Sequence, residues 1–291
     1  MSEKFYEEID GGIRTTRDVN INEPVSLQNN ITIGGDVVIG DGVEICEGVE
    51  IGDDVEIHIN VTIGKNVRIG GGVTIGNYVT IGGDVEIGRK VVIGENVVIG
   101  ENVIIRDYIE ICKNINIGEN VIIRDYVEIG EGVRIGEDVI IGRIVRIGEN
   151  VEIGEGVKVY VNVAIDRDVI IGKYAKIGVG VRISENVTIG AGAYIAYHTM
   201  IYYNVKGGTG AFCFTNLYKH PVHIYLRDTG ERIIGLGCHH RTISEWESDF
   251  YNNPEEFPEG APQTDEREFA YDIAKQIAEK KYSKHYKESQ K

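Results

Sequence analysis

The chain repeats every six residues from about Ile9 to Lys206, a span of 198 residues or 33 repeats. The first position of each repeat is almost always Ile, the second is mostly Gly and the fifth is mostly Val, as in the repeats that begin at Ile93, Ile99 and Ile117. A strict internal repeat of this length constrains the fold more than any other feature, because each unit can bury its apolar side chains only against its neighbours.

Each repeat predicts one short strand and one tight turn. The Val-x-Ile run alternates inward, outward and inward, as a strand does. The following Gly-x-Asn, Gly-x-Asp or Gly-x-Gly turns a corner, because these residues tolerate the left-handed backbone of tight turns. Three edges close a triangle of 18 residues, so 33 repeats predict about 11 coils. Stacked at roughly 4.8 Å, the coils form a prism on the order of 50 Å long around one apolar column.

The pattern resembles the hexapeptide-repeat superfamily, and the resemblance covers about two thirds of the chain. It implies an all-β solenoid, a left-handed parallel β-helix, over residues 9–206. Residues 1–8 are expected to be a lead-in, in which Phe5 and Tyr6 cover the open edge of the first coil.

The repeat ends at Gly207, and residues 207–291 are predicted to form a small α+β module. Two apolar runs around Asp228-Thr229-Gly230 predict a hairpin, and the capping box of 242–245 predicts a short helix with Trp246. The residues expected on the apolar face of a second helix are Phe269, Ile273 and Ile277. The order of hairpin, Gly-Cys turn and Trp helix resembles tails of phage-encoded repeat proteins, which implies a phage origin.

Composition excludes several classes of function. The net charge of −16 argues against a nucleic-acid partner, and no apolar run approaches the roughly 20 residues of a membrane span. The acidic start lacks the regions of a signal peptide, so a cytoplasmic location is expected. Cys46 and Cys112 replace turn Gly residues on different corners and cannot pair, so they are expected to be free thiols.

Acidic residues gather near the start of the prism. Residues 33–56 contain eight acids and no base. This cluster is consistent with a solvated surface that prevents nonspecific association. It is also consistent with an acidic rod that imitates DNA.

Apolar residues at outward positions predict an interface. Stacked 18 residues apart, they would form one strip with a charged edge, and such a patch usually marks a contact between proteins. The strand residues are Ile104, Ile122 and Ile140, the corner residues are Tyr108, Tyr126 and Ile144, and the charged edge includes Arg106 and Arg124. The alternative is a ladder that stabilises a bare β surface through cross-strand pairs.

The resemblance also implies an acyltransferase, because most hexapeptide-repeat proteins have this activity. In that family a His acts as general base, and coenzyme A or acyl carrier protein supplies the acyl group in a groove between subunits of a trimer. The prism contains only two histidines, His58 and His198. His198 is the better candidate, because three tyrosines are expected to crowd around it: Tyr197, Tyr202 and Tyr203. The loop and the Gly-x-Pro-Ala turn of family enzymes are absent, which weakens this prediction.

A metal site and a cofactor are not predicted. Ligand-type residues occur in the tail, but no pair has the C-x2-C spacing of a dependable zinc site. They are Cys213, His220, His223, Cys238, His239 and His240. His58 and His198 would lie about eight coils apart and cannot share an ion within one chain.

The sequence therefore favours a non-enzymatic structural or protein-binding homotrimer that packs along the strip and presents its C-terminal module to a protein partner. The alternative is an acyltransferase with an inter-subunit site near His198. The third interpretation is the acidic rod, which would compete for a nucleic-acid-binding protein.

Overall fold

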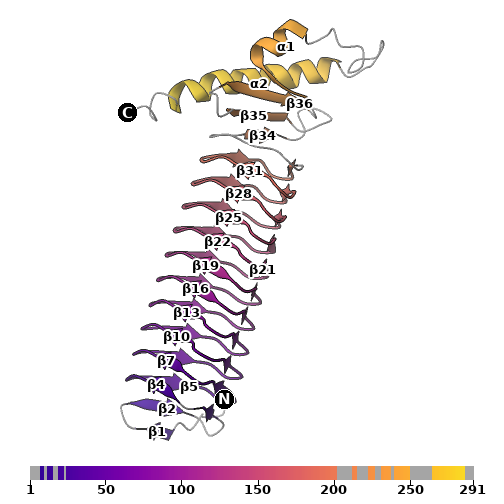
Figure 1. Ribbon diagram of the computed structural model, residues 1–291. Helices are drawn as coiled ribbons and strands as arrows, with labels where there is room; N and C mark the ends of the chain where they lie inside the picture. The colour runs from indigo at the N-terminus through magenta and orange to yellow at the C-terminus, as the bar shows by residue number, and fades with distance from the viewer. Residues whose placement is uncertain are drawn as a thin grey trace, which may run out of the picture.

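The computed structural model describes residues 7–9, 12–15, 19–22, 24–201, 212–214, 222–226, 231–236, 239–249 and 264–285. It is a long three-sided prism with strands and two helices at its C-terminal end (Figure 1). The prediction of a left-handed parallel β-helix with a small C-terminal α+β module is confirmed. Within the described residues sheet B has 11 strands and sheet C has 10, in agreement with the predicted coil number.

Sheet A forms one side of the prism and continues into the C-terminal module. Its strands are, in order, β1 (Glu7–Ile9), β2 (Ile13–Thr15), β5 (Thr32–Ile33), β8 (Glu50–Ile51), β11 (Arg68–Ile69), β14 (Glu86–Ile87), β17 (Ile104–Ile105), β20 (Ile122–Ile123), β23 (Ile140–Ile141), β26 (Lys158–Val159), β29 (Lys176–Ile177), β32 (Tyr194–Ile195), β34 (Phe212–Phe214), β35 (Val222–Leu226), β36 (Arg232–Leu236) and β37 (His239–Thr242).

Sheets B and C form the other two sides. Sheet B contains β3 (Val19–Ile21), β6 (Val37–Ile39), β9 (Glu56–Ile57), β12 (Thr74–Ile75), β15 (Val92–Ile93), β18 (Glu110–Ile111), β21 (Val127–Ile129), β24 (Val145–Ile147), β27 (Ala164–Ile165), β30 (Arg182–Ile183) and β33 (Met200–Ile201). Sheet C contains β4 (Val25–Leu27), β7 (Val43–Ile45), β10 (Thr62–Ile63), β13 (Thr80–Ile81), β16 (Val97–Ile99), β19 (Ile115–Ile117), β22 (Arg134–Ile135), β25 (Glu152–Ile153), β28 (Ile170–Ile171) and β31 (Thr188–Ile189).

The core is the apolar column that the repeat predicts. In the parallel register each residue pairs with the one 18 positions later, so Ile105, Ile123 and Ile141 stack in successive coils. Each of these side chains is almost completely buried. Full burial of one such side chain contributes about 1.5–3 kcal/mol, and the gain recurs along the whole prism.

Three corners join the sheets, and we name them by the sheets they connect: the A–B, B–C and C–A corners. The third residue of most corners has a positive φ, for example Asn102 at 57° and Asp138 at 57°. At most corners the first residue is glycine, because a side chain there meets the next coil: a Cβ on Gly118 would lie 2.8 Å from the backbone of Gly136. These two requirements explain the Gly-x-Asn signature of the repeat.

The N-terminal strand departs from the ladder. β1 pairs with β2 in antiparallel register, and the parallel ladder starts at β2. Phe5 and Tyr6, which were expected to cover the first coil, lie outside the described residues.

The C-terminal module continues sheet A. β34 pairs in parallel with β32, and β35, β36 and β37 follow in antiparallel register. Helix α1 (Ile243–Asp249) begins with a capping box, in which Thr242 Oγ1 accepts a hydrogen bond from the Glu245 amide at 3.2 Å and the Glu245 carboxylate accepts one from the Thr242 amide at 2.7 Å. Trp246 is buried beneath it and donates from Nε1 to the Ile234 carbonyl at 2.7 Å.

Helix α2 (Thr264–His285) covers β35 and β36. The expected apolar face was wrong, because Phe269 is 58% exposed and Ile273 is only half-buried, while the side chain of Ile277 lies outside the described residues. The side chains that pack on the sheet are instead Ala270, Tyr271, Ala274 and Ala278. Small residues let the helix approach the sheet closely, so the larger apolar ones fall outside the contact.

The cysteines of the prism lie as the repeat predicts. Cys46 is in a C–A corner and Cys112 is in a B–C corner, and both are free thiols. The side chains of Cys213 and Cys238 lie outside the described residues.

Candidate functional site

The A–B corner carries the corner residues of the apolar strip. Tyr108 and Tyr126 stack with ring centroids 5.1 Å apart and ring planes 9° apart. Lys90 places its Nζ 5.3 Å from the centre of the Tyr108 ring, one coil below. Ile144 follows in the next coil with φ of 58°, a conformation that β-branched residues rarely adopt. All three strip residues in this corner are about half exposed.

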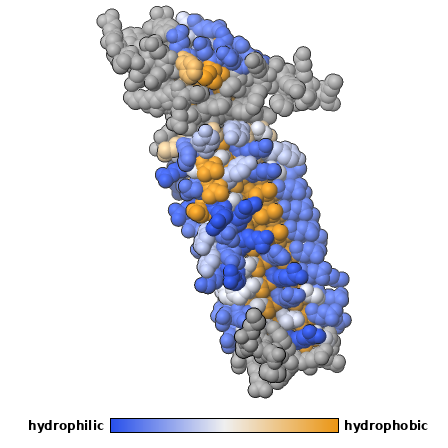
Figure 2. Space-filling model, turned by 180° about the vertical axis from the view of Figure 1, so that it is seen from behind, coloured by the Kyte–Doolittle hydropathy of each residue, from blue (hydrophilic) through white to orange (hydrophobic). Residues whose placement is uncertain are grey.

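Sheet A supplies the strand residues of the strip. Ile104, Ile122 and Ile140 are Cα partners in β17, β20 and β23, and each is half-buried. The strip therefore runs over three coils, across the edge between sheet A and the A–B corner. Figure 2 shows hydrophobic side chains in an upright band between hydrophilic ones on one face of the prism.

Charged groups fix the border of the strip. Asp107 accepts hydrogen bonds from the backbone NH of Arg89 at 2.8 Å and from its guanidinium at 3.0 Å. The backbone hydrogen bond is the largest cause that holds the pKa of Asp107 below its usual value. Arg106 lies 3.6 Å from Glu86, and Arg143 lies 3.2 Å from Asp125. Arg124 occupies the same corner position as Arg106, one coil later.

The same corner stays apolar above the strip, which the sequence analysis missed. Val161, Val179 and Tyr197 occupy its middle position in three successive coils, and all three are exposed. Their spacing of 18 residues is visible in the sequence and could have revealed the extension. We call the strip together with these three residues the A–B ridge.

His198 lies in the column of the strip's corner residues. The residues of this column, in successive coils, are Tyr108, Tyr126, Ile144, Asn162, Gly180 and His198. The His198 amide donates to the Val179 carbonyl at 2.7 Å, as its counterparts do in the coils below. Its imidazole is exposed and meets the Tyr197 ring edge-on, with ring centroids 6.0 Å apart. A Cβ on Gly180 would collide with this imidazole, so glycine leaves the space that the ring occupies. Tyr202 and Tyr203 lie outside the described residues.

His58 lies on a different edge. It opens a B–C corner near the other end of the prism, and its Nε2 lies 3.8 Å from the exposed Glu56 carboxylate. Since the two histidines are on different corners and about eight coils apart, they cannot act on one substrate within a single chain.

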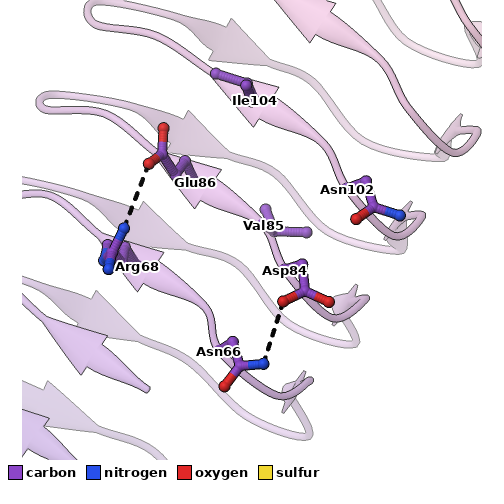
Figure 3. Close-up of a pocket in the computed structure, with 7 residues that line it drawn as sticks. All are labelled: Asn66, Arg68, Asp84, Val85, Glu86, Asn102 and Ile104. Carbon is purple, nitrogen blue, oxygen red and sulfur yellow. Dashed lines mark hydrogen bonds and ion pairs between the residues drawn. The ribbon is translucent and has the colours of Figure 1, made fainter. Parts of the chain in front are cut away.

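A shallow hollow opens on sheet A and the preceding C–A corner, at the lower end of the strip (Figure 3). Asn66 donates to Asp84 at 3.1 Å, and Arg68 lies 3.6 Å from Glu86. The remaining lining residues are Val85, Asn102 and Ile104. Ile104 and His198 are five coils apart, roughly 25 Å, so the hollow and the histidine are separate features of one chain.

Two features are absent from the described residues. No group of three or more His, Cys, Asp or Glu side chains in this part of the chain is arranged to hold a metal ion. No helix in the same residues is long and apolar enough to cross a membrane.

Comparison with known proteins supports the resemblance that the repeat predicts. The family model described as "Bacterial transferase hexapeptide (six repeats)" matches residues 48–83 and 66–100. The predicted resemblance to the hexapeptide-repeat superfamily is confirmed over these residues. No curated protein sequence matches this hexapeptide-repeat chain.

Solved structures of acyltransferases are similar to this hexapeptide-repeat protein. UDP-N-acetylglucosamine acyltransferase of Arabidopsis is 16% identical with a TM-score of 0.40, and covers 86% of each chain. The enzyme of Moraxella catarrhalis is 13% identical with a TM-score of 0.38, and covers 92% of this chain and 93% of its own. The enzyme of Campylobacter jejuni is 22% identical with a TM-score of 0.28, and covers 50% of this chain and 67% of its own. At these identities and TM-scores the similarity carries no argument about activity.

The family match corrects the functional prediction. The sequence analysis placed a non-enzymatic structural or protein-binding role first, and that prediction is wrong. The model that matches the repeats is one of transferases, which favours the acyltransferase alternative. The acidic rod is also a non-enzymatic interpretation, and it is rejected together with the structural role.

Proposed function

We propose that this protein is an acyltransferase whose active site lies near His198, at a contact between the subunits of a homotrimer. The observation that carries the proposal is the match of residues 48–83 and 66–100 to a family of bacterial transferases. The acyl donor is an acyl thioester of coenzyme A or of acyl carrier protein, and it acts as a substrate and not as a resident cofactor. The acceptor is a hydroxyl or an amine.

The position of His198 supports this assignment. It lies in the same corner column as Tyr108, Tyr126 and Ile144, beside the apolar side chains of the A–B ridge. An exposed corner has no walls of its own, and it cannot exclude water from a reacting group. Packing of the ridge against a second subunit would place His198 at the rim of the contact, where the neighbour supplies the missing walls.

The chemistry requires one proton acceptor at that place. The His198 imidazole removes the proton from the acceptor hydroxyl or amine as its oxygen or nitrogen attacks the thioester carbonyl. The new bond to the acyl carbon forms, the C–S bond of the donor breaks, and His198 returns the proton to the departing thiolate. An exposed imidazole is accessible to both substrates.

Replacing His198 with alanine is expected to lower turnover by about 10²–10⁴-fold, because this is the usual contribution of a general base. Release of free thiol from acetyl-coenzyme A, with a panel of hydroxyl and amine acceptors, measures the effect. His58→Ala is the matched control, since it removes the same side chain from another corner, and its turnover should stay at the wild-type level. Equal turnover of His198→Ala and the wild type would reject the site. Failure of every coenzyme A and carrier-protein donor would reject the activity.

The predicted protein partner of the C-terminal module and the predicted trimer both remain proposals. Capture of a partner is a separate question from catalysis, because the module continues sheet A beyond the coil that carries His198.

A further inference from the structure

Most bases in the described coils form an ion pair with an acid in a neighbouring coil. On sheet A, Arg68 lies 3.6 Å from Glu50 in the coil below and 3.6 Å from Glu86 in the coil above. Lys173 lies 2.9 Å from Glu155 in the same way, on the C–A corner. Such ladders stabilise the prism, because opposite charges on neighbouring strands attract each other.

Lys158 and Lys176 break this pattern on the upper part of sheet A. They are direct Cα partners in β26 and β29, and both side chains are exposed. Neither forms an ion pair with an acid among the described residues. The acid nearest in sequence, Glu155, is engaged by Lys173 and by the Tyr174 hydroxyl. Since like charges at paired positions repel each other, an anion between the two ammonium groups would stabilise them.

Two tyrosines border the lysine pair. Tyr194 is the Cα partner of Lys176 on the next strand of sheet A, and Tyr160 is the second residue after Lys158. Their side chains are 43% and 44% exposed, respectively. The position one coil above Tyr160 is Gly178, so no side chain covers the surface beside Lys176 there. We call Lys158, Tyr160, Lys176 and Tyr194 the Lys–Tyr patch.

A phosphate group matches the charge of this patch. A phosphate monoester carries about −1.5 to −2 charges at pH 7 and presents three acceptor oxygens, whereas a carboxylate carries a single charge. Lysine ammonium groups bind phosphate as point charges, with three donors each. We propose that Lys158 and Lys176 bind the phosphate group of a small organic ligand, whose organic part lies against Tyr160 and Tyr194. Tyrosine suits that role, because its ring offers an apolar face and a polar tip.

The location of the patch assigns this ligand as the acyl acceptor. Tyr194 and His198 belong to the same coil, and Lys176 lies one coil lower, roughly 4.8 Å along the prism axis. A phosphate held there keeps a nearby hydroxyl or amine of the same molecule close to the general base. In coenzyme A, the whole pantetheine arm separates the thioester from the phosphates, so the donor matches this spacing less well. The assignment as acceptor rests on the proposed function, whereas phosphate binding does not.

Calorimetry on the full-length protein tests binding without any turnover. Inorganic phosphate and glucose 6-phosphate should bind, and glucose and glucuronate should bind at least about 10-fold more weakly than glucose 6-phosphate, because charge-assisted hydrogen bonds to phosphate contribute at least this factor. Replacing Lys158 and Lys176 together with glutamine should weaken binding of both phosphate compounds by roughly 10-fold or more. The matched control is Lys65→Gln with Lys113→Gln, which removes two charges from other edges of the prism and should bind normally.

Tyr194→Ala separates the role of the ring from that of the charges. It should weaken the binding of glucose 6-phosphate and leave that of inorganic phosphate unchanged. Failure of the wild-type protein to bind either phosphate compound would overturn the proposal. Equal affinities for glucose and glucose 6-phosphate, or equal losses in the two double variants, would do the same.

Competition distinguishes an acceptor phosphate from a donor phosphate. Dephospho-coenzyme A lacks the phosphate monoester of coenzyme A. If coenzyme A displaces glucose 6-phosphate and dephospho-coenzyme A does not, the patch binds the donor, and its assignment to the acceptor is wrong. A wild-type protein that binds phosphate at the patch but transfers no acyl group would reject the proposed function and support the binding site.

Discussion

Replacing Ile122 and Tyr126 together with glutamate is expected to split the oligomer into monomers and leave the β-helix folded. Both side chains point outward on the A–B ridge, so the coil core keeps all of its contacts. In an assembled oligomer, each substitution places an unpaired charge in a desolvated apolar contact, which costs several kcal/mol per charge. Light scattering measures the mass, and circular dichroism checks that the β structure is intact.

The control places the same two charges on another edge of the prism. Tyr78 is also a third corner residue, with φ of 58°, but it lies in a B–C corner. Thr80 is the outward residue of the following strand, β13. Glutamate at both positions should leave the oligomer intact. A double variant of Ile122 and Tyr126 that keeps the wild-type mass would show that the ridge is not the interface.

Most of the prism could be predicted from the sequence because each structural role recurs at a fixed position. Inward Ile and Val, a mostly small first corner residue and a left-handed third one recur along the prism, so local rules decide most of the β-helix. The outward Ile104, Ile122 and Ile140 were visible for the same reason, as departures from an otherwise regular pattern.

The C-terminal module was harder because its contacts are long-range. The face of α2 that packs on the sheet is lined by alanines and Tyr271, whereas a search for large apolar residues selects Phe269, which is exposed. Likewise, no local spacing connects His223 with His240. Only the register of β35, β36 and β37 brings them together.

The functional assignment failed for a different reason. The absence of the family's loop and turn from the sequence weighs against an enzyme, but an absent feature of a family does not exclude its chemistry. The column that joins Tyr108, Tyr126 and Ile144 to His198 was already present in the spacing of 18 residues. Following that column upward would have connected the predicted interface with the predicted general base.

Adjacent residues of β20 should separate the energetics of folding from those of assembly. Ile123 points inward and is fully buried, so Ile123→Ala removes buried methyl groups and leaves a cavity, at a cost of about 2–5 kcal/mol. Ile122 points outward, and Ile122→Ala should affect mainly the contact between subunits. Urea denaturation at several protein concentrations measures both variants.

The concentration dependence identifies which contact each variant loses. The shift caused by Ile123→Ala should be the same at every protein concentration, because the cavity lies within one subunit. The shift caused by Ile122→Ala should shrink as the protein is diluted below the concentration at which it assembles, since a monomer has no contact to lose. Hydrogen exchange should show faster opening in β17, β20 and β23 for Ile123→Ala only, because each coil is held by its neighbours. Equal, concentration-independent shifts for both variants would mean that Ile122 supports the fold of the single chain and not its assembly.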